Sequence, residues 1–260
     1  MKGGLALPPP RGFALDRAWV LGCIASRHDL AHYEAHPGEL PCRAVEVRLD
    51  LIGPDAPRWL SRCRSLRVLG YRVLLTLRVR REGGAWSGSA AERWAILHDA
   101  LAKGAADAVD WEIHSAGAGE MAERVREFGG PAAWVASWHR FSGSCDVQRL
   151  AEETIRAASV GARWIKLAVM AETPEEWARL KRAWEELPGM LPEGCPLPVL
   201  VPMGTEGGRH RVEMAVPGRG ALLFGSLGTA TAPGQPTAAE LYAALDSKVL
   251  YKRLAKHLIR

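Results

Sequence analysis

The sequence predicts a single-domain α/β fold, a TIM (β/α)8 barrel, on three observations. Eight short apolar runs rich in strand-forming residues recur along the chain, with helix-like segments between them. Their spacing is roughly 30 residues per unit, as in parallel βαβ architecture. The length of 260 residues suits one barrel of this kind, which commonly forms a single domain.

Each strand prediction rests on a short apolar run bounded by polar or turn-forming residues. In chain order the runs are 19–25, 44–51, 72–79, 107–113, 132–138, 163–169, 197–203 and 221–227. The clearest predicted helices are 89–104, 145–161 and 173–189. The last begins with Thr173 and Pro174, a capping residue followed by a proline in the first turn.

A doubly wound open sheet is the competing arrangement. No GxGxxG motif follows the first run, which weakens the dinucleotide-binding version of that fold. We expect residues 18–260 to form the barrel and residues 1–17 to form a flexible lead-in. That lead-in contains three consecutive prolines and lacks the apolar block of a signal peptide.

The composition is that of a globular protein, because 48% of the residues are hydrophobic. No apolar run approaches the roughly 20 residues that cross a membrane, so we expect a soluble, cytoplasmic protein without a membrane partner. The five cysteines are scattered and form no CxxC pair. They favour reduced thiols over a disulfide framework or a zinc site.

The net charge is +5, and most basic residues are arginines. No basic run with interleaved aromatic residues is present, which argues against a nucleic-acid partner. The charge has two interpretations, a solvated arginine-rich surface or a positive field that attracts a small anion. The first is favoured, because net charge reports weakly on function.

Polar residues are concentrated near the ends of the predicted strands, where barrel enzymes carry their chemistry. Strand side chains alternate between two faces, so Glu46, Arg48 and Asp50 share a face that is expected to look into the barrel. The later runs and the segments that directly follow them add further polar residues: Thr76, Arg78, Glu82, Asp110, Glu112, Ser137, His139, Lys166, Arg211, Thr231 and Gln235. The alternative is an internal salt-bridge network that fills the barrel.

Lys166 lies in the middle of the apolar run RWIKLAVM. A strand lysine more often extends to water than reacts, but here carboxylates, arginines and a histidine project toward the same mouth. Burial among arginines lowers the pKa of a lysine, and a neutral amine forms a Schiff base with a ketone. The set therefore predicts a lysine-imine lyase or aldolase that acts on a small, oxygen-rich anion.

These motifs resemble those of the type I 3-dehydroquinate dehydratases, the imine-forming enzymes of the shikimate pathway of aromatic amino acid biosynthesis. The matching pieces follow the family's order: Glu46-Val-Arg48-Leu-Asp50, Thr76-Leu-Arg78, Glu82-Gly-Gly84, Asp110-Trp-Glu112, Ser137-Trp-His139-Arg-Phe141, Lys166-Leu-Ala-Val-Met170, 203–211 and Thr231-Ala-Pro-Gly-Gln235. Each piece alone is weak, and together they extend over nearly the whole chain.

The resemblance implies a role for each site residue. Lys166 would form the imine with the C3 ketone of 3-dehydroquinate, and His139 would remove the C2 proton and protonate the departing C1 hydroxyl. Glu82 would hold His139. The substrate carboxylate would be bound by Arg211, Thr231 and Gln235, and the ring hydroxyls by Glu46, Arg48 and Arg78. The resemblance also implies a homodimer and no metal or organic cofactor.

The chain departs from the family pattern at three positions. His210 stands where serine is expected, Thr231 replaces the usual serine, and Cys23 lies about where a small hydroxyl residue is found. Two alternatives therefore stay open beside the dehydratase. One is another lysine-imine enzyme for a related anion, signalled by His210, and the other is a non-catalytic anion-binding homologue.

Two further segments carry weaker signals. His28, His32 and His36 recur every four residues and would form a stripe on a helix. We interpret the stripe as a solvated helix face, because no acidic or cysteine partner completes a metal site in the sequence. Residues 247–260 predict a basic amphipathic helix. Binding to a membrane surface is one interpretation, and packing against the barrel or a second subunit is favoured.

Overall fold

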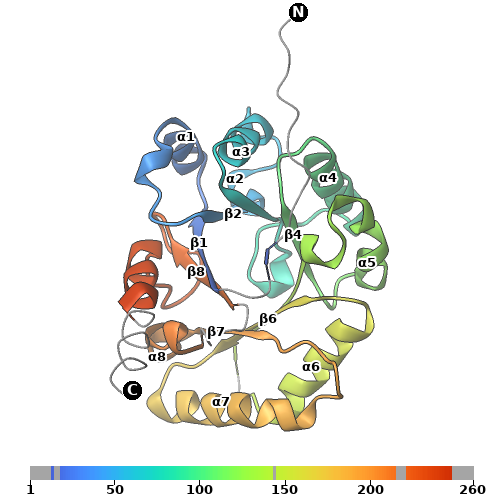
Figure 1. Cartoon of the computed structure of the whole chain (residues 1–260), viewed down its shortest axis with the longest axis vertical. Coiled ribbons are helices and arrows are strands. Elements are labelled where there is room, and N and C mark those ends of the chain that lie inside the picture. The colour runs from blue at the N-terminus through green and yellow to red at the C-terminus, as the bar shows by residue number, and fades with distance from the viewer. Residues whose placement is uncertain (1–12, 15–17, 143–144, 215–220, 248–260) are drawn as a thin grey trace, which may run out of the picture.

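Eight parallel strands form a nearly closed barrel that helices surround (Figure 1). The computed structural model describes residues 13–14, 18–142, 145–214 and 221–247. The sheet order is β7-β6-β5-β4-β3-β2-β1-β8, so neighbours in sequence are neighbours in space and β8 returns to β1. The predicted TIM-barrel class is thereby confirmed.

All eight predicted strands are present. They are β1 (Ala18–Ile24), β2 (Ala44–Arg48), β3 (Arg72–Thr76), β4 (Ala108–Glu112), β5 (Trp134–Arg140), β6 (Trp164–Met170), β7 (Val199–Met203) and β8 (Ala221–Ser226). The helices are α1 (Arg27–Ala35), α2 (Leu49–Ile52), α3 (Trp59–Val68), α4 (Ala90–Ala102), α5 (Met121–Arg124), α6 (Val147–Ser159), α7 (Pro174–Glu186) and α8 (Gly204–Arg209).

The three helices predicted with most detail begin at side-chain caps. Ser89 forms a capping box with Glu92 at the start of α4. The Asp146 side chain accepts from a backbone N–H of α6, and Thr173 does the same for α7. Local sequence therefore fixes where these helices begin.

Every strand differs from its predicted bounds by at least one residue, and the changes that matter for the site are in β2, β3 and β5. The chain turns into α2 directly after Arg48, and β3 ends at Thr76, so both strands are shorter than predicted. A 3-10 turn over Gly130–Ala133 delays the start of β5, which then runs on to Arg140. This shift places His139 within the strand, on the same face as Ser137.

The core has two layers, one inside the barrel and one between the strands and the helices. The interior layer includes Leu21, Leu74 and Val135, while the outer layer contains Trp111 and Trp138, both buried. The alternation of strand side chains separates the two layers. It places the motif residues beside these tryptophans on the opposite, inward face.

Phe13 closes the N-terminal end of the barrel interior. Its side chain is buried among the interior residues and packs edge-on against Trp19 at 5.4 Å. The indole N–H of Trp164, at the start of β6, donates to the Phe13 carbonyl at 3.0 Å. Within the range expected to be a lead-in, this residue is an ordered part of the barrel.

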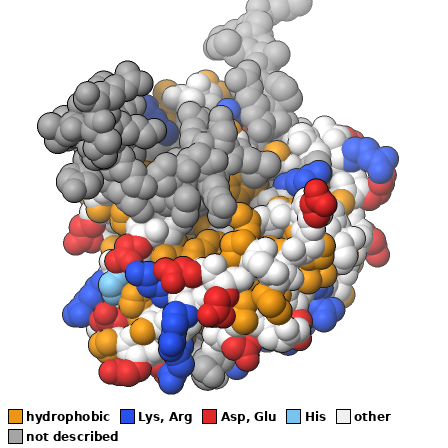
Figure 2. All heavy atoms as spheres, turned by 60° about the horizontal axis from the view of Figure 1, so that its bottom comes forward, with side chains coloured by type: hydrophobic (Ala, Val, Ile, Leu, Met, Phe, Trp, Pro, Cys, Tyr) orange, Lys and Arg blue, Asp and Glu red, His pale blue; other side chains and the backbone are white. Residues whose placement is uncertain are grey.

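On the face drawn in Figure 2, basic and acidic side chains are interspersed. This arrangement agrees with a net charge that is spread over the surface. Within the described ranges, every helix is too short or too polar to span a bilayer. Residues 248–260, nearly all of the segment predicted to form a C-terminal amphipathic helix, lie outside the described residues.

Replacement of Phe13 by alanine should destabilise the protein by about 3–5 kcal/mol, the usual cost of removing a buried phenylalanine. Urea unfolding followed by tryptophan fluorescence measures this change. The matched control is Phe141→Ala, because the Phe141 side chain is exposed and its removal should change the unfolding free energy little. Equal stabilities for the two variants would contradict a structural role for Phe13.

Candidate active site

One pocket is lined by every residue to which the family resemblance gave a role. Its polar lining comprises Glu46, Arg48, Arg78, Glu82, His139, Lys166, Arg211, Thr231 and Gln235. The apolar lining includes Phe141, Ala168, Val201, Met203 and Phe224. The space inside the pocket, with its open mouth included, is about 650 Å³. A few polar groups converge on it among apolar side chains, as in small-molecule sites.

Lys166 projects from β6 into this pocket and is only 6% exposed. Its Nζ lies 3.6 Å from Oδ2 of Asp110 and 4.1 Å from the ring centroid of Phe224. Burial lowers the pKa of Lys166, and Arg78 lowers it further. Asp110 and Glu46 raise this pKa, but the net shift is downward. The amine is therefore easier to deprotonate than an exposed lysine.

His139 and Glu82 form a buried pair at the pocket wall. Oε2 of Glu82 lies 3.0 Å from Nδ1 of His139 and also accepts the His139 backbone N–H at 3.2 Å. Burial, Arg78 and Lys166 lower the pKa of His139 well below its usual value. Burial raises the pKa of Glu82 to about 7. The lowered pKa keeps the His139 ring neutral. With the ring proton on Nδ1, donated to Glu82, Nε2 carries the free lone pair of a base.

Beneath the lysine lies a buried ion-pair network centred on Arg78. The Arg78 guanidinium donates to Asp110 at 2.7 Å, Glu112 at 3.1 Å and Ser137 at 2.6 Å. Arg93, which extends inward from α4, forms an ion pair with the second oxygen of Glu112. The predicted alternative, an internal salt-bridge network, is thus present together with the pocket and forms its floor.

A second group of polar contacts orients Glu46. Thr76 Oγ1 donates to one carboxylate oxygen at 2.8 Å, and the Cys23 thiol donates to the other at 3.1 Å. Burial and the neighbouring Glu46 raise the pKa of Cys23 well above its usual value. The thiol is therefore protonated and acts as a hydrogen-bond donor, the role open to the hydroxyl that it replaces.

Arg48 and the glycine loop are fixed by Asp50. The Arg48 guanidinium makes a two-pronged contact with Asp50 at 3.0 and 2.8 Å, and Asp50 also accepts the Ala85 backbone N–H at 3.1 Å. Gly84 is required in this loop, since a Cβ there would lie 2.1 Å from the Arg78 carbonyl oxygen. The loop that carries Glu82 is thereby held against the pocket.

Arg211 is buried and keeps one donor unused. Its Nε donates to the Pro202 carbonyl at 3.0 Å and one terminal nitrogen donates to the Phe224 carbonyl at 2.6 Å. The other terminal nitrogen has no hydrogen-bond partner among the described residues. Burial lowers the pKa of Arg211 to about 10, so it stays cationic at neutral pH. A buried cation with an unused donor suits an anionic ligand.

Thr231 and Gln235 line the pocket from the loop after β8. The Gln235 side-chain oxygen accepts both the backbone N–H and the hydroxyl of Thr231, at 2.6 and 3.0 Å. Its amide nitrogen donates to the Cys23 sulfur at 3.2 Å and to the Phe224 carbonyl at 3.3 Å. This loop is thus closed onto the first and last strands of the barrel.

Four contributors were not assigned a role from the sequence. Asp110 and Glu112 were recognised as motif residues, but their contacts with Arg78 and Lys166 depend on the register of neighbouring strands. Arg93 was missed, because it lies on a helix whose sequence pattern alone does not distinguish an inward-pointing arginine. Phe224 was missed because it reads as an ordinary core residue of β8.

The described residues contain one group with metal-ligating side chains close together, His32, His36 and Glu39. It lies on α1 and the following 3-10 turn, and none of its members lines the pocket. The five cysteines are free thiols.

Comparison with known proteins agrees with this geometry. Residues 24–251 match the family model for type I 3-dehydroquinase. A 3-dehydroquinate dehydratase of Pyrobaculum aerophilum is 33% identical over 80% of this chain, and the match covers 64% of that protein. A 3-dehydroquinate dehydratase of Methanothrix thermoacetophila is 33% identical over 77% of this chain and 80% of its own length.

The fold also matches a crystal structure of 3-dehydroquinate dehydratase from Geobacillus kaustophilus, with a TM-score of 0.78. The sequence identity is 23%, and the match covers 94% of this chain and 98% of that one. The family model, which spans most of the barrel, carries the assignment. The chain belongs to the type I 3-dehydroquinase family.

Proposed function

We propose that this protein is a 3-dehydroquinate dehydratase that eliminates water from 3-dehydroquinate to give 3-dehydroshikimate through an imine on Lys166. The family membership supports the substrate and the reaction. The observation that carries the mechanism is a buried amine of lowered pKa that shares one pocket with a neutral imidazole held by Glu82.

In this mechanism the neutral Nζ of Lys166 attacks the C3 ketone, and loss of water gives the iminium. The iminium withdraws electrons from C2, so Nε2 of His139 can take the C2 proton. The resulting enamine expels the C1 hydroxyl, which leaves as water with the proton from His139. Hydrolysis of the product imine then releases 3-dehydroshikimate and regenerates the amine.

The register of the strands supports the pairing of these two groups. Ser137 on β5 is the cross-strand partner of Lys166 on β6. His139 lies two residues further along β5, on the same face as Ser137, so its side chain projects into the pocket one pleat above the lysine. Glu82 holds the imidazole from the loop side, which selects the orientation of Nε2.

The remaining residues would position the substrate. Arg211, with its unused donor, is the proposed partner of the substrate carboxylate, together with Thr231 and Gln235. Glu46, Arg48 and Arg78 are proposed to hold the ring hydroxyls, since each lines the pocket and is fixed by neighbours. No metal or organic cofactor takes part in this scheme.

The protein is further proposed to work in the cytoplasm as a homodimer. The free thiols suit a reducing compartment, and the family resemblance supports the dimer. Sedimentation velocity on the full chain tests the oligomeric state.

Sodium borohydride added with 3-dehydroquinate should trap a covalent adduct on the Lys166 peptide, detected by mass spectrometry. Lys166→Ala should lose both the adduct and turnover. His139→Ala should keep the adduct while the rate falls by about 10²–10⁴-fold, the range for loss of a general acid–base. Turnover is followed by the absorbance of the conjugated product.

The same measurements separate the alternatives. A parent enzyme that forms the adduct but does not turn over 3-dehydroquinate would be an imine enzyme for another anion. A parent that binds the substrate without an adduct would be a non-catalytic binder. Undiminished turnover by Lys166→Ala would rule out the proposed mechanism altogether.

Asp110→Asn should move the acidic limb of the kcat/KM profile to lower pH. The reacting amine must be neutral, so the rate rises as pH rises through the pKa of Lys166, and Asp110 is a charge that raises this pKa. Removing the charge also takes away one of the two buried carboxylates paired with Arg78, and Glu112 remains. The unfolding free energy should therefore fall by less than the about 3–5 kcal/mol that follows when a buried charge loses its only partner. Urea unfolding and pH-dependent steady-state kinetics measure the two effects.

The native Asp110 carboxyl contributes its own pH dependence to stability. Although burial raises its pKa, Arg78 and Lys166 lower it below the usual value, so its contribution is present at neutral pH and is lost as pH falls through the lowered pKa. Asp99→Asn, at an exposed ion pair of α4, is the control. A kcat/KM limb that stays in place in Asp110→Asn would contradict the coupling to Lys166.

A further inference from the structure

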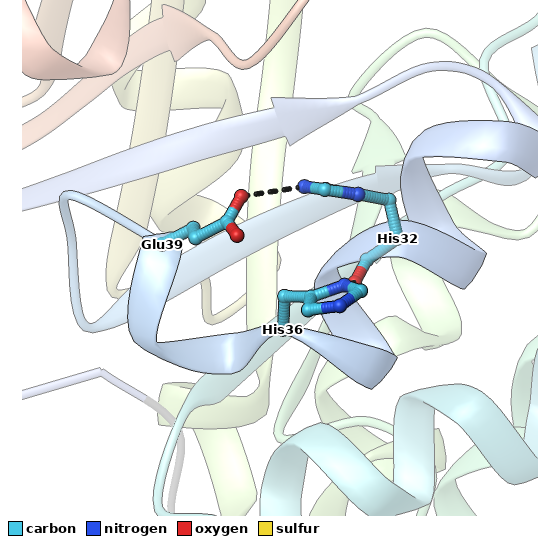
Figure 3. Close-up of side chains that lie close together, drawn as sticks. All are labelled: His32, His36 and Glu39. Atoms are coloured by element: carbon cyan, nitrogen blue, oxygen red, sulfur yellow. Dashed lines mark hydrogen bonds and ion pairs between the residues drawn. The ribbon is translucent and has the colours of Figure 1, made fainter.

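A cluster of potential metal ligands lies outside the active site, at the junction of α1 and the 3-10 turn η1 (Pro37–Glu39). His32 is in the last turn of α1, His36 follows its end, and Glu39 ends η1. Figure 3 shows His32 and Glu39 pointing toward each other, with His36 beside them at this junction. We propose that His32, His36 and Glu39 bind one Zn²⁺ ion.

The geometry is close to that of a three-ligand site. One ligand atom from each residue lies within 4.8 Å of those of the other two, and Nε2 of His32 is 2.7 Å from Oε2 of Glu39. Tetrahedral zinc with bonds of about 2.0–2.2 Å needs ligand atoms about 3.3 Å apart. The His36 and Glu39 side chains are exposed and His32 is half-buried, so small side-chain rotations suffice to bring the atoms together.

The choice of ligands favours zinc over the hard cations. Two imidazoles and one carboxylate form a set that binds Zn²⁺ with water in the fourth position. Nδ1 of His36 lies 3.2 Å from the His32 carbonyl oxygen. While an Nδ1–H donates there, Nε2 of His36 carries the lone pair that a metal requires. Mg²⁺ prefers oxygen ligands and would not compete.

The sequence pattern indicated no acidic partner for the histidine stripe, whereas the structure places Glu39 beside His32. Glu39 lies seven residues after His32. The Pro37–Gly38 step turns the chain back after α1, so that a residue beyond the helix faces the His32 ring. Spacing along a helix shows only which helical residues are neighbours, and it gives no information on a ligand from the next turn.

The bound ion would cross-link the end of α1 to the turn that leads into β2. Tyr33, beside His32, donates from its hydroxyl to the Leu227 carbonyl at 3.1 Å, which joins the same helix to the end of β8. The helix α1 would therefore be connected both to the end of β8, through Tyr33, and to the turn before β2, through the ion. Zinc that binds only the folded chain raises its thermal stability by mass action.

The test uses the full chain with any affinity tag removed and bound metal stripped by a chelator. Titration calorimetry with ZnCl₂ should show one site per chain, unaffected by excess MgCl₂. Each of His32→Ala, His36→Ala and Glu39→Gln should weaken binding by at least about tenfold, because even loss of a supporting partner costs about 10–100-fold. The apparent Tm of the parent should rise by several degrees with ZnCl₂.

His28→Ala is the matched control, since His28 stacks on His32 at a centroid distance of 6.3 Å on the same helix but lies outside the ligand group. This variant should keep the affinity and the Tm increase of the parent. Stoichiometric zinc binding that persists in the His32→Ala/His36→Ala double variant would place the ion elsewhere and overturn the proposal. So would a parent that binds no zinc at one equivalent, or equal weakening in His28→Ala.

Discussion

The ion pairs among Arg78, Asp110 and Glu112 are the constraint on which the pocket depends. Each of these charges is buried, and a buried charge without a partner is strongly destabilising. The network satisfies them by joining β3, β4 and β5 through side chains rather than backbone. Because the floor consists of paired charges, the Lys166 amine can be buried above it and still lie 3.6 Å from the Asp110 carboxylate.

The protonation states of the two reacting groups follow from the same network. Arg78 lowers the pKa of both Lys166 and His139, whereas Asp110 raises that of the lysine. Burial acts in the same direction as Arg78 on both groups. The balance leaves the imidazole neutral and makes the amine easier to deprotonate, which is the combination required when one group must attack a ketone and the other must accept a proton.

The sequence predicts the fold and the residues that line the pocket. It does not predict side-chain contacts that depend on how separate elements are placed against one another. Period-two alternation placed Glu46, Arg48 and Arg78 on inward faces, and the family resemblance supplied Arg211, Thr231 and Gln235. The contact of Arg93 with Glu112 joins a helix to a strand, and the pattern of α4 does not predict it. Likewise, Glu39 meets His32 only because a turn reverses the chain after α1.

The substitution at His210 illustrates why a departure beside a site residue need not alter the site. The His210 ring stacks on Trp177 at 4.5 Å and contacts Glu213 and Glu206 at 2.6 and 3.1 Å. Partial burial lowers its pKa, but these two carboxylates raise it overall.

His210 is absent from the pocket lining, whereas its neighbour Arg211 is directed inward and is fixed by the Pro202 and Phe224 carbonyls. The added bulk and charge are thus accommodated between α7 and α8, on the side away from the ligand. For this reason the geometry gives no support to the idea that His210 signals a different substrate, and the position of Arg211 rests on backbone contacts that a change at residue 210 leaves in place.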